Sequence, residues 1–288
     1  MSPLKSSRSR TVGKLLDVYK DSDLSLRGNA QSSRYNPAFP SYLRPDDDGA
    51  YLIVAMPLNG DYTDYAHYYN GEATETSRTW SATTGTGGVV EFQTSQYKFY
   101  NNAWRANNGT GGAFASTTDM TTADFEYATN VDFCFECWAY IDSGASDTAL
   151  FGSSKGASLP GSSNGSMGLQ VRGAGSGLTG AMQGFCLGDP DRATGGSWTY
   201  GQWNHYAITR SGSTFTYWYN GSSVGSNTQS GTMPQAICLN ANSLVLGPSN
   251  PYAPTGSTNK NVYINDVRVY KGIPKYTTTF TPPSSIII

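Results

Sequence analysis

The chain has 288 residues, of which only 14% are Asp, Glu, Lys or Arg, whereas glycine (33) and tyrosine (20) are abundant. With 13% aromatic residues the composition excludes a disordered chain or a largely helical protein, and it favours many short strands joined by turns. The formal net charge of −2 hides an asymmetry: residues 1–45 hold eight basic and three acidic residues, whereas the remainder holds eleven basic and eighteen acidic residues. A basic arm on an acidic body indicates separate roles for the two parts.

Residues 1–49 are predicted to be an arm with a Pro-rich linker, and residues 50–288 a single large domain. The first ten residues are basic and lack an apolar period, so we expect them to be ordered only by a partner. From Thr11 to Leu26 apolar residues cluster, which predicts one short helix that needs a surface to pack on. Three prolines within positions 37–45 favour an extended linker, and the run Asp46–Asp48 is interpreted as solvated, with a cation site as the alternative.

The arm is interpreted as a tether that docks on another protein; the alternatives are a disordered tail and an arm that folds back on its own body. Three isoleucines at the C-terminus would be unusual if exposed, so we expect a neighbouring subunit of a homo-oligomer to cover them. The candidate docking residues are therefore Arg8, Arg10, Leu15, Leu16, Val18, Tyr19, Ile286, Ile287 and Ile288. Nucleic-acid binding is not predicted, because the charges of the arm are not interleaved with aromatic residues.

Neither a secretory signal nor a membrane span is predicted, since the N-terminus has no apolar h-region and no apolar run approaches roughly 20 residues. We therefore expect synthesis in a reducing cytoplasm without a signal peptide. The four cysteines include a C-x-x-C at Cys134 and Cys137, whose side chains would point to opposite faces of a strand. Buried free thiols are expected at the cysteines, and neither a zinc site nor structural disulfides.

In the body, turn signals separate short stretches with strand character, and no helical period appears. The expected strands are Tyr51–Leu58, Val89–Phe92, Tyr97–Tyr100, Ala113–Ala115, Phe133–Ile141, Met167–Arg172, Met182–Leu187, Trp203–Arg210, Phe215–Tyr219, a short strand after Asn220-Gly221, Ser243–Leu246 and Tyr263–Tyr270. Strands at this spacing predict an all-β, antiparallel jelly-roll β-sandwich.

The segment Phe133–Ile141 (FCFECWAYI) separates into two sets of alternating residues. One face would carry Phe133, Phe135, Cys137, Ala139 and Ile141, and the other Cys134, Glu136, Trp138 and Tyr140. The first face is predicted to point into the core because it is entirely apolar.

Four stretches in the right order resemble the laminin-G-like, concanavalin A-like lectin/glucanase superfamily, over about 80% of the chain. They are YLIVAMPLNGDYTDYA (51–66), FCFECWAYID (133–142), WNHYAITRSGSTFTYWYNGSSVGS (203–226) and NDVRVYKGIPKYTTTFTPP (265–283). The last stretch is similar to the closing motif of such domains in virion proteins of tailed phages, especially marine ones.

The resemblance implies a non-enzymatic phage virion structural protein, a capsid decoration or capsid fibre, which displays a lectin-like domain outward. Its partner would be a capsid or tail protein, docked through the basic arm, and it would be made in the host cytoplasm. The chain has no repeats or heptads of a long shaft, so any projection must be short. The alternatives are a carbohydrate-binding tail or receptor-binding module for host surface glycan, and a glycan hydrolase.

Catalysis is not predicted. Retaining glycosidases need paired carboxylates about 5–5.5 Å apart, but the residues two positions from Glu136 are Cys134 and Trp138, and Asp124-Phe125-Glu126 lacks a third acid. The histidines, His67 and His205, have no G-x-S-x-G companion, and His205 is interpreted as structural.

No cofactor is required by the sequence, but calcium is the family's most frequent one, and the resemblance would place it at Asp61 and Asp64. Asp266 also matches a family position, yet it is expected to pair with Arg268 or cap a strand end. Glycan binding would use aromatic residues in loop-like contexts, and the alternative for each is packing beneath a loop. These candidates are Tyr68, Tyr69, Trp80, Trp104 and Trp198.

Overall fold

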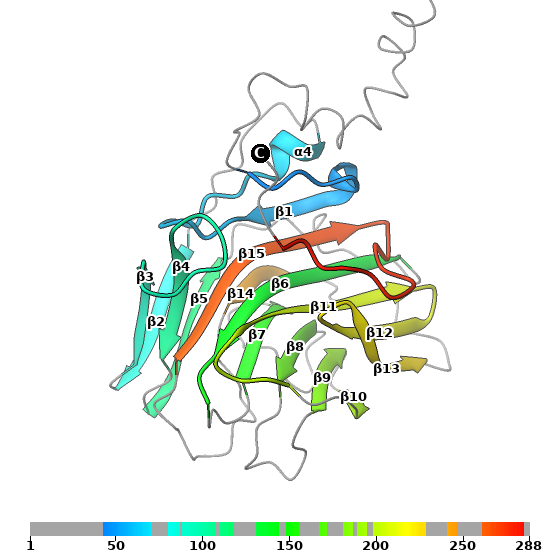
Figure 1. Ribbon diagram of the computed structural model, residues 1–288. Helices are drawn as coiled ribbons and strands as arrows, with labels where there is room; N and C mark the ends of the chain where they lie inside the picture. The colour runs from blue at the N-terminus through cyan, green and yellow to red at the C-terminus, as the bar shows by residue number, and fades with distance from the viewer. Residues whose placement is uncertain are drawn as a thin grey trace, which may run out of the picture.

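Two antiparallel sheets form the protein, as a computed structural model shows (Figure 1). The structure describes residues 43–70, 80–86, 88–107, 110–117, 131–143, 148–155, 167–171, 181–186, 189–194, 198–228, 241–246 and 261–284. The expected arm helix, the basic docking residues and the isoleucines at 286–288 lie outside these ranges. No helix in the described part of the chain is long and apolar enough to cross a membrane.

The first sheet, sheet A, has the strand order β13-β12-β11-β6-β15-β4-β3, and β1 also pairs with β15. Its strands are β1 (Leu52–Met56), β3 (Val89–Gln93), β4 (Ala103–Asn107), β6 (Phe133–Ile141), β11 (Trp203–Ser211), β12 (Thr214–Tyr219), β13 (Ser222–Thr228) and β15 (Asn261–Lys271). Figure 1 shows β15, β6 and β11 in front of the second sheet.

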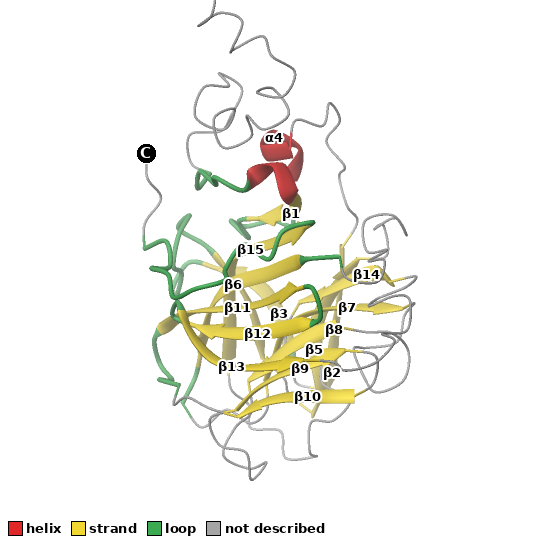
Figure 2. Ribbon diagram, turned by 90° about the vertical axis from the view of Figure 1, so that its right-hand side faces the viewer, coloured by secondary structure: helices red, strands yellow, loops and turns green. Residues whose placement is uncertain are grey.

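The second sheet, sheet B, has the order β10-β9-β8-β7-β14-β5-β2. Its strands are β2 (Trp80–Thr86), β5 (Thr110–Thr117), β7 (Thr148–Lys155), β8 (Met167–Val171), β9 (Ala181–Cys186), β10 (Asp189–Thr194) and β14 (Ala241–Leu246). The remaining described elements are the 3-10 turn η1 (Gly49–Tyr51) and the short helix α4 (Ala66–Asn70), which lies beyond β1 in Figure 2. The predicted jelly-roll β-sandwich is confirmed.

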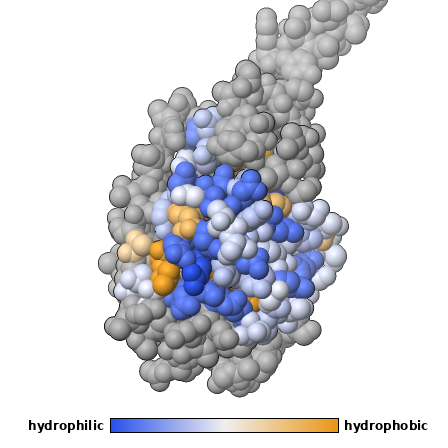
Figure 3. Space-filling view, turned by 60° about the vertical axis from the view of Figure 1, so that its left-hand side comes forward, coloured by the Kyte–Doolittle hydropathy of each residue, from blue (hydrophilic) through white to orange (hydrophobic). Residues whose placement is uncertain are grey.

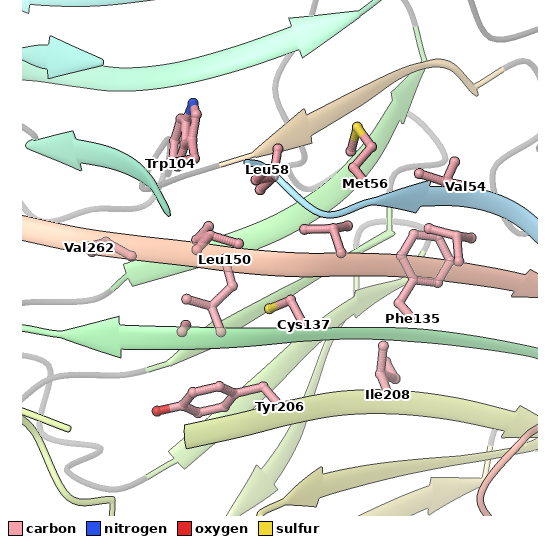
Figure 4. Packing of buried hydrophobic residues seen from close by; sticks show 14 of the residues in the cluster. Val54, Met56, Leu58, Trp104, Phe135, Cys137, Leu150, Tyr206, Ile208 and Val262 are labelled. Atoms are coloured by element: carbon pink, nitrogen blue, oxygen red, sulfur yellow. The ribbon is translucent and has the colours of Figure 1, made fainter. Parts of the chain in front are cut away.

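The main core lies on the face of sheet A that is turned toward sheet B. Alternate residues of its strands fill this space, because successive side chains of a strand point to opposite faces. All five apolar residues of β6 that were predicted to face inward belong to it, together with Val54, Met56, Tyr206 and Val262 among others (Figure 4). Cys137 is in this core and Cys134 is on the other face, and both are buried free thiols.

Most expected strands are present, but Tyr97–Tyr100 is not one. These residues form a loop, and the strand that follows, β4, begins at Ala103. The aromatic-rich stretch YKFY resembles a strand in composition, yet the chain turns at Tyr100 and Asn101, which both have positive φ (64° and 61°). The strands β2, β4, β7 and β10 and the helix α4 were not predicted.

Strand β15 organises sheet A through a β-bulge in its middle. The register against β6 shifts between Asn265 and Arg268, and Asp266 has a φ of 52°. The extra residue reverses the alternation, so that Tyr263 and Asn265 before the bulge and Arg268 after it share the outer face. The bulge also divides one edge of β15, because Asn261 to Ile264 pair with β4 whereas Val267 to Tyr270 pair with β1.

The outer face of sheet A is covered at the β1 end by two segments distant in sequence. One is the N-terminal segment, residues 43–51, and the other is the C-terminal strap, residues 272–284. Together with α4 they bury a second apolar cluster that contains Leu43, Leu52, Ala66, Tyr69, Cys134, Ala207, Trp218 and Tyr270. In the strap, the rings of Tyr276 and Phe280 stack at 3.5 Å and pack against Trp218. Sequence reasoning expected one buried face of β6, whereas nearly all of both faces is buried.

Candidate functional site

Three aromatic side chains lie across the end of the outer face that neither residues 43–51 nor the C-terminal strap covers, and we call them the aromatic row: Trp203 on β11, Tyr140 on β6 and the largely buried Tyr263 on β15. The sheet register brings them together, because Trp203 pairs with Tyr140 and Tyr140 pairs with Tyr263. The ring of Tyr140 packs edge-on against both, with centroid distances of 6.0 Å to Trp203 and 5.5 Å to Tyr263. Cross-strand aromatic pairs stabilise a sheet and restrict the orientation of each ring. Trp203 and Tyr140 are partly exposed.

Charged and amide side chains continue the row toward the sheet edge. Arg105 on β4 is opposite Tyr263, and Glu91 on β3 is opposite Arg105. The Arg105 guanidinium pairs with Glu91 and donates to Asn261 Oδ1 from Nε at 2.9 Å and from Nη2 at 2.7 Å. Asn261 Nδ2 in turn donates to Asp142 Oδ2 at 2.8 Å. Because Glu91 is exposed and Arg105 partly exposed, this end of the row presents polar groups to solvent.

The described surface on this side of the molecule is mostly hydrophilic or neutral, with only small hydrophobic patches (Figure 3). Tyrosine and tryptophan lie near the middle of a hydropathy scale, so an aromatic row does not stand out there as a hydrophobic patch. Such a surface fits a polar ligand with apolar faces better than it fits a hydrophobic partner.

Lys98 borders the aromatic row on the side of the covered region. Its Nζ lies 4.1 Å from the centroid of the Trp138 ring and 5.6 Å from that of Phe99. Trp138 stands two residues before Tyr140 on the same face of β6, so the ammonium is next to the row. Burial lowers the pKa of Lys98 below its ordinary value. The side chain of the preceding residue, Tyr97, is 44% exposed.

The loop that carries Lys98 is fixed by one buried amide, that of Asn265 at the bulge of β15. Its Oδ1 accepts from the backbone N–H of Phe99 at 2.8 Å and of Lys98 at 3.2 Å. Its Nδ2 donates to the carbonyls of Pro57 at 2.8 Å and Asn102 at 3.0 Å. All four hydrogen-bonding positions of the amide are used, which sets the loop in place relative to the sheet.

Two indole N–H groups at this end of the face lack a hydrogen-bond partner among the described residues. They are Nε1 of Trp138 and Nε1 of Trp203, and both atoms are buried. Buried donors in proteins are nearly always paired, and the exceptions often lie at sites that serve a function. Two such donors on the outer face, one of them on the ring that Lys98 contacts, therefore mark this region as a candidate binding site.

At the opposite end of the outer face lies a buried charge network of three cations and three anions. Its members are Arg44, Asp46, Glu136, Asp266, Arg268 and Lys275, and the side chain of each is at most 8% exposed. Buried charges are tolerated only when they are paired and hydrogen-bonded, so a balanced set of six is a structural element in its own right.

Arg44 connects the N-terminal segment to both central strands of sheet A. Its Nε donates to Asp266 Oδ2 at 2.7 Å, and its Nη2 donates to Glu136 Oε1 at 3.0 Å. Its backbone carbonyl accepts from Arg268 Nη2 at 2.9 Å and from the hydroxyl of Tyr69 at 2.7 Å. The segment before η1 is therefore held by side chain and backbone alike.

Asp46 was expected to be part of a solvated run, and this expectation is wrong. Its carboxylate is 4% exposed and accepts from Arg268 Nη1 at 2.6 Å, from Lys275 Nζ at 2.9 Å and from the hydroxyl of Tyr270. Burial alone would raise the pKa of Asp46, but Lys275 and Arg268 hold it well below its ordinary value. The neighbouring Asp47 is exposed, so only a partner distant in sequence distinguishes the two aspartates.

Glu136 is the carboxylate at the centre of the network. It pairs with Arg44, lies 3.4 Å from Lys275 Nζ, and accepts from the hydroxyls of Tyr270 and Tyr276. Despite burial, Lys275 and the neighbouring donors hold the pKa of Glu136 far below its ordinary value. Nε2 of the buried His205 lies 3.4 Å from Glu136 Oε2.

The contacts of the charge network indicate a structural role. The acid expected to pair with Arg268, Asp266, does so at 3.0 Å, and the buried acids Asp46 and Glu136 are equally engaged by cations. A general acid and a nucleophile need carboxylates that face a substrate, whereas these carboxylates face arginine and lysine. The network fits a framework role.

Two of the predicted glycan-binding residues are buried, which corrects the expectation that they lie in surface loops. Trp104 is on β4, 0% exposed, and its Nε1 donates to the hydroxyl of Tyr62 at 2.9 Å. Tyr69 is on α4 and 1% exposed, with its hydroxyl bonded to Arg44 O. In both cases strand or helix packing consumes the aromatic ring, and the glycine- and asparagine-rich surroundings misled the interpretation.

The other predicted residues do not form a common site with the aromatic row. Tyr68 is partly buried on α4 and stacks with Tyr65 at 6.0 Å, and Trp198 packs against Tyr219 at 5.6 Å. Trp80 is on β2, and its side chain lies outside the described part of the structure.

The two candidate calcium ligands are used by the backbone. Asp64 Oδ1 accepts from Ala55 N at 2.8 Å and from Ala66 N at 3.0 Å, which ties α4 to β1. Asp61 Oδ1 accepts from Thr63 N at 2.9 Å. Within the described ranges no group of three or more His, Cys, Asp and Glu residues could hold a metal ion. The hydrogen bonds of Oδ1 give both aspartates a structural role, and calcium binding by them stays a prediction.

Sequence reasoning missed the aromatic row and Lys98. The alternation of FCFECWAYI did place Trp138 and Tyr140 on one face, but that face was not considered for binding. Their neighbours Trp203 and Tyr263 come from strands about 60 and 120 residues further along the chain, and only strand register brings them into line.

Solved structures with a similar fold include binding domains of botulinum neurotoxins. The binding domain of serotype D/C strain VPI 5993 matches with a TM-score of 0.54 and 11% identity, over 77% of this chain and 49% of that one. A structure of botulinum neurotoxin type C, reported with cell entry dependent upon interaction with two ganglioside molecules, gives 0.53 and 10% over 78% and 48%. A complex of the D/C binding domain with rat synaptotagmin II gives 0.51 and 11% over 77% and 48%. At these identities the likeness concerns the fold alone, and this chain spans about half the length of those it matches.

No curated protein matches this chain. The family model of the concanavalin A-like lectin/glucanases superfamily matches residues 108–274, more than half of the chain. These residues include β6, β11 and β15, the strands that carry the aromatic row and half of the charge network. With its two antiparallel sheets and this match, the chain belongs to the concanavalin A-like lectin/glucanases superfamily.

Proposed function

We propose that the protein is a non-catalytic recognition module of a tailed-phage virion, in which the sandwich binds host surface glycan and the basic arm attaches it to a capsid or tail protein. The observation that carries the glycan-binding part is the aromatic row at the uncovered end of the outer face. Sugar rings have apolar faces that stack on aromatic rings and hydroxyls that pair with planar polar side chains. The row offers both, with Arg105, Glu91 and Asn261 beside Tyr263.

In this proposal, attachment and binding belong to opposite ends of one strand. The N-terminal segment is clamped beside Arg268 by the charge network, and the aromatic row crosses β15 at Tyr263. Five residues of extended chain separate these positions by about 15 Å. Leu43, the first described residue, therefore belongs to the end of the sheet that is away from the aromatic row.

The similar botulinum neurotoxin domains support the proposal by analogy, because one of them is described as depending on ganglioside molecules for cell entry. They show that a sandwich of this kind can serve recognition. The phage assignment comes from the closing stretch NDVRVYKGIPKYTTTFTPP and from the basic arm.

Glycan binding is tested with purified protein on an array of bacterial surface polysaccharides, followed by titration calorimetry with the best ligand. We expect Trp203→Ala and Tyr140→Ala to weaken binding at least about tenfold, since stacking on one aromatic ring contributes about 1–3 kcal/mol in comparable contacts. Tyr51→Ala is the matched control, because Tyr51 is 44% exposed but lies at the β1 end of the sheet. Equal losses in all three variants, or no glycan bound by the native protein, would contradict the proposal.

Attachment is tested by deleting residues 1–42 and measuring incorporation into phage particles. The deletion stops before Leu43, because Leu43, Arg44 and Asp46 belong to the folded body. We expect a folded protein that is missing from purified virions. Undiminished incorporation would rule out the arm as the attachment. Removal of the isoleucines at 286–288 tests the proposed homo-oligomer separately, by the mass of the assembly in solution.

A further inference from the structure

We propose that the glycan bound on the aromatic row is acidic, with a sugar carboxylate held by Lys98; this rests on the glycan-binding function proposed above. Lys98 forms no ion pair with the described residues, and its contacts there are with the rings of Trp138 and Phe99. The other cation beside the row, Arg105, is already engaged by Glu91 and Asn261. Lys98 is thus the cation at this site that is available to an anionic ligand.

The position of the ammonium relative to the row fits a substituent of a stacked sugar ring. Trp138 and Tyr140 are two residues apart on one face of β6, which separates their Cα atoms by about 7 Å. Trp203 is opposite Tyr140 on the neighbouring strand β11, about 5 Å from Tyr140. Since Lys98 Nζ lies 4.1 Å from the Trp138 ring centroid, it stands within one sugar residue of Tyr140 and Trp203.

The electrostatics of the loop favour an anion here. A partly buried ammonium has lost part of its hydration, and a cation–π contact replaces only part of that loss. A carboxylate would supply the missing counter-charge in a charge-assisted hydrogen bond. The lysine is also held in position, because Asn265 binds the backbone N–H groups of both Lys98 and Phe99.

The two ends of the row then have different partners, which orients the ligand. The end at Lys98 takes the carboxylate, whereas the end at Tyr263 presents Glu91 and Asp142, whose oxygens accept hydrogen bonds from sugar hydroxyls. A ligand turned the other way would bring its carboxylate toward these two acids. Arg105 compensates Glu91, but the hydrogen bonds to the Asp142 carboxylate within the described structure come only from the N–H groups of the neutral Asn261, so repulsion from Asp142 disfavours that direction of the glycan chain.

The experiment compares acidic polysaccharides with their own carboxyl-reduced forms. Alginate, polygalacturonate, hyaluronate and polysialic acid fragments are each immobilised in native and carboxyl-reduced form, so that only the charge differs within a pair. Binding is measured for the full chain and for Lys98→Met, Lys98→Arg and the distant control Lys271→Met. We expect at least one native form to bind about tenfold or more tightly than its reduced partner, and this preference to fall with rising salt.

The variants distinguish a specific contact between Lys98 and the sugar carboxylate from a general attraction of polyanions to the protein. We expect Lys98→Met to abolish the preference for the native form, Lys98→Arg to retain it, and Lys271→Met to leave it unchanged. If the protein binds native and reduced forms equally, or binds only neutral glycans on the array, the acidic ligand is refuted while the glycan-binding function stands. If it binds no polysaccharide in either form, both proposals fail.

Discussion

Substitution of Arg44 by methionine tests whether the charge network anchors the N-terminal segment. Methionine retains much of the side-chain volume but removes the partner of Asp266 and Glu136, which lie 2.7 and 3.0 Å from the guanidinium. Breaking a buried ion pair by removing one member costs about 3–5 kcal/mol, because the remaining charge is left uncompensated. We expect a loss of free energy of unfolding in that range.

The assay is equilibrium unfolding in urea, since guanidinium chloride would itself screen the ion pairs. With an m-value of about 3 kcal/mol/M, the midpoint should fall by about 1 M or more. Hydrogen exchange adds a local readout: the amides of residues 43–51 should lose more protection than those of β11 and β12.

The matched control is Arg105→Met, which breaks the partly exposed pair with Glu91. Pairs of this kind contribute about 1 kcal/mol or less. If Arg44→Met and Arg105→Met destabilise the protein equally, by less than about 1 kcal/mol, the network is hydrated and the segment is held by its apolar contacts alone. That result would refute the anchoring role.

Three further perturbations follow from the same contacts. The pKa values of Asp46, Glu136 and Asp266 are lowered by neighbouring cations despite burial, so the folded protein binds protons more weakly than the unfolded chain. The contribution of these three carboxylates to the free energy of unfolding is complete above about pH 5 and is lost as the pH falls further. The urea midpoint should therefore decline below that pH, and less steeply in Glu136→Gln. A midpoint that does not change with pH would contradict this. Gly221→Ala should detach the C-terminal strap from the sheet, because a Cβ at this position would lie 1.9 Å from Phe280 O and the φ of Gly221 is 82°. Detachment is measured as faster protease cleavage within residues 272–284. Unchanged resistance to cleavage would show that the strap can shift to make room for the Cβ. Asn265→Ala removes the hydrogen bonds that this amide makes to two N–H groups and two carbonyls, of which Pro57 O keeps the N–H of Asp266, and it should cost about 2 kcal/mol or more by urea unfolding. It should also weaken glycan binding by releasing Lys98, and unchanged binding would disconnect the loop from the site.

The charge network explains why Asp46 and Asp266 could not be interpreted equally well from sequence. Asp266 and Arg268 are two residues apart, so their pairing could be predicted from local spacing. The partners of Asp46 are more than 200 residues away, at Arg268 and Lys275. A run of three aspartates beside a proline looks solvated until the tertiary structure supplies the cations.

The aromatic row likewise depends on contacts between residues far apart in the sequence. Alternation within β6 is a local property, and it correctly sorted nine residues into two faces. Which residues lie next to Tyr140 depends on how β11 and β15 pair with β6, and a shift by one residue would have put other side chains beside it. The bulge at Asn265 adds to this, because it reverses the alternation of β15 and cannot be located from the apolar pattern alone.

Sequence alone determined the fold class, the inward face of β6, the hairpin of β11 and β12 and the closing strand β15, because each depends on the period of two and on local turn residues. Only the tertiary structure decided which end of the outer face of sheet A holds the buried charge network and which end holds the aromatic row. Both outcomes depend on contacts between strands and segments far apart in the chain, and no local pattern encodes them.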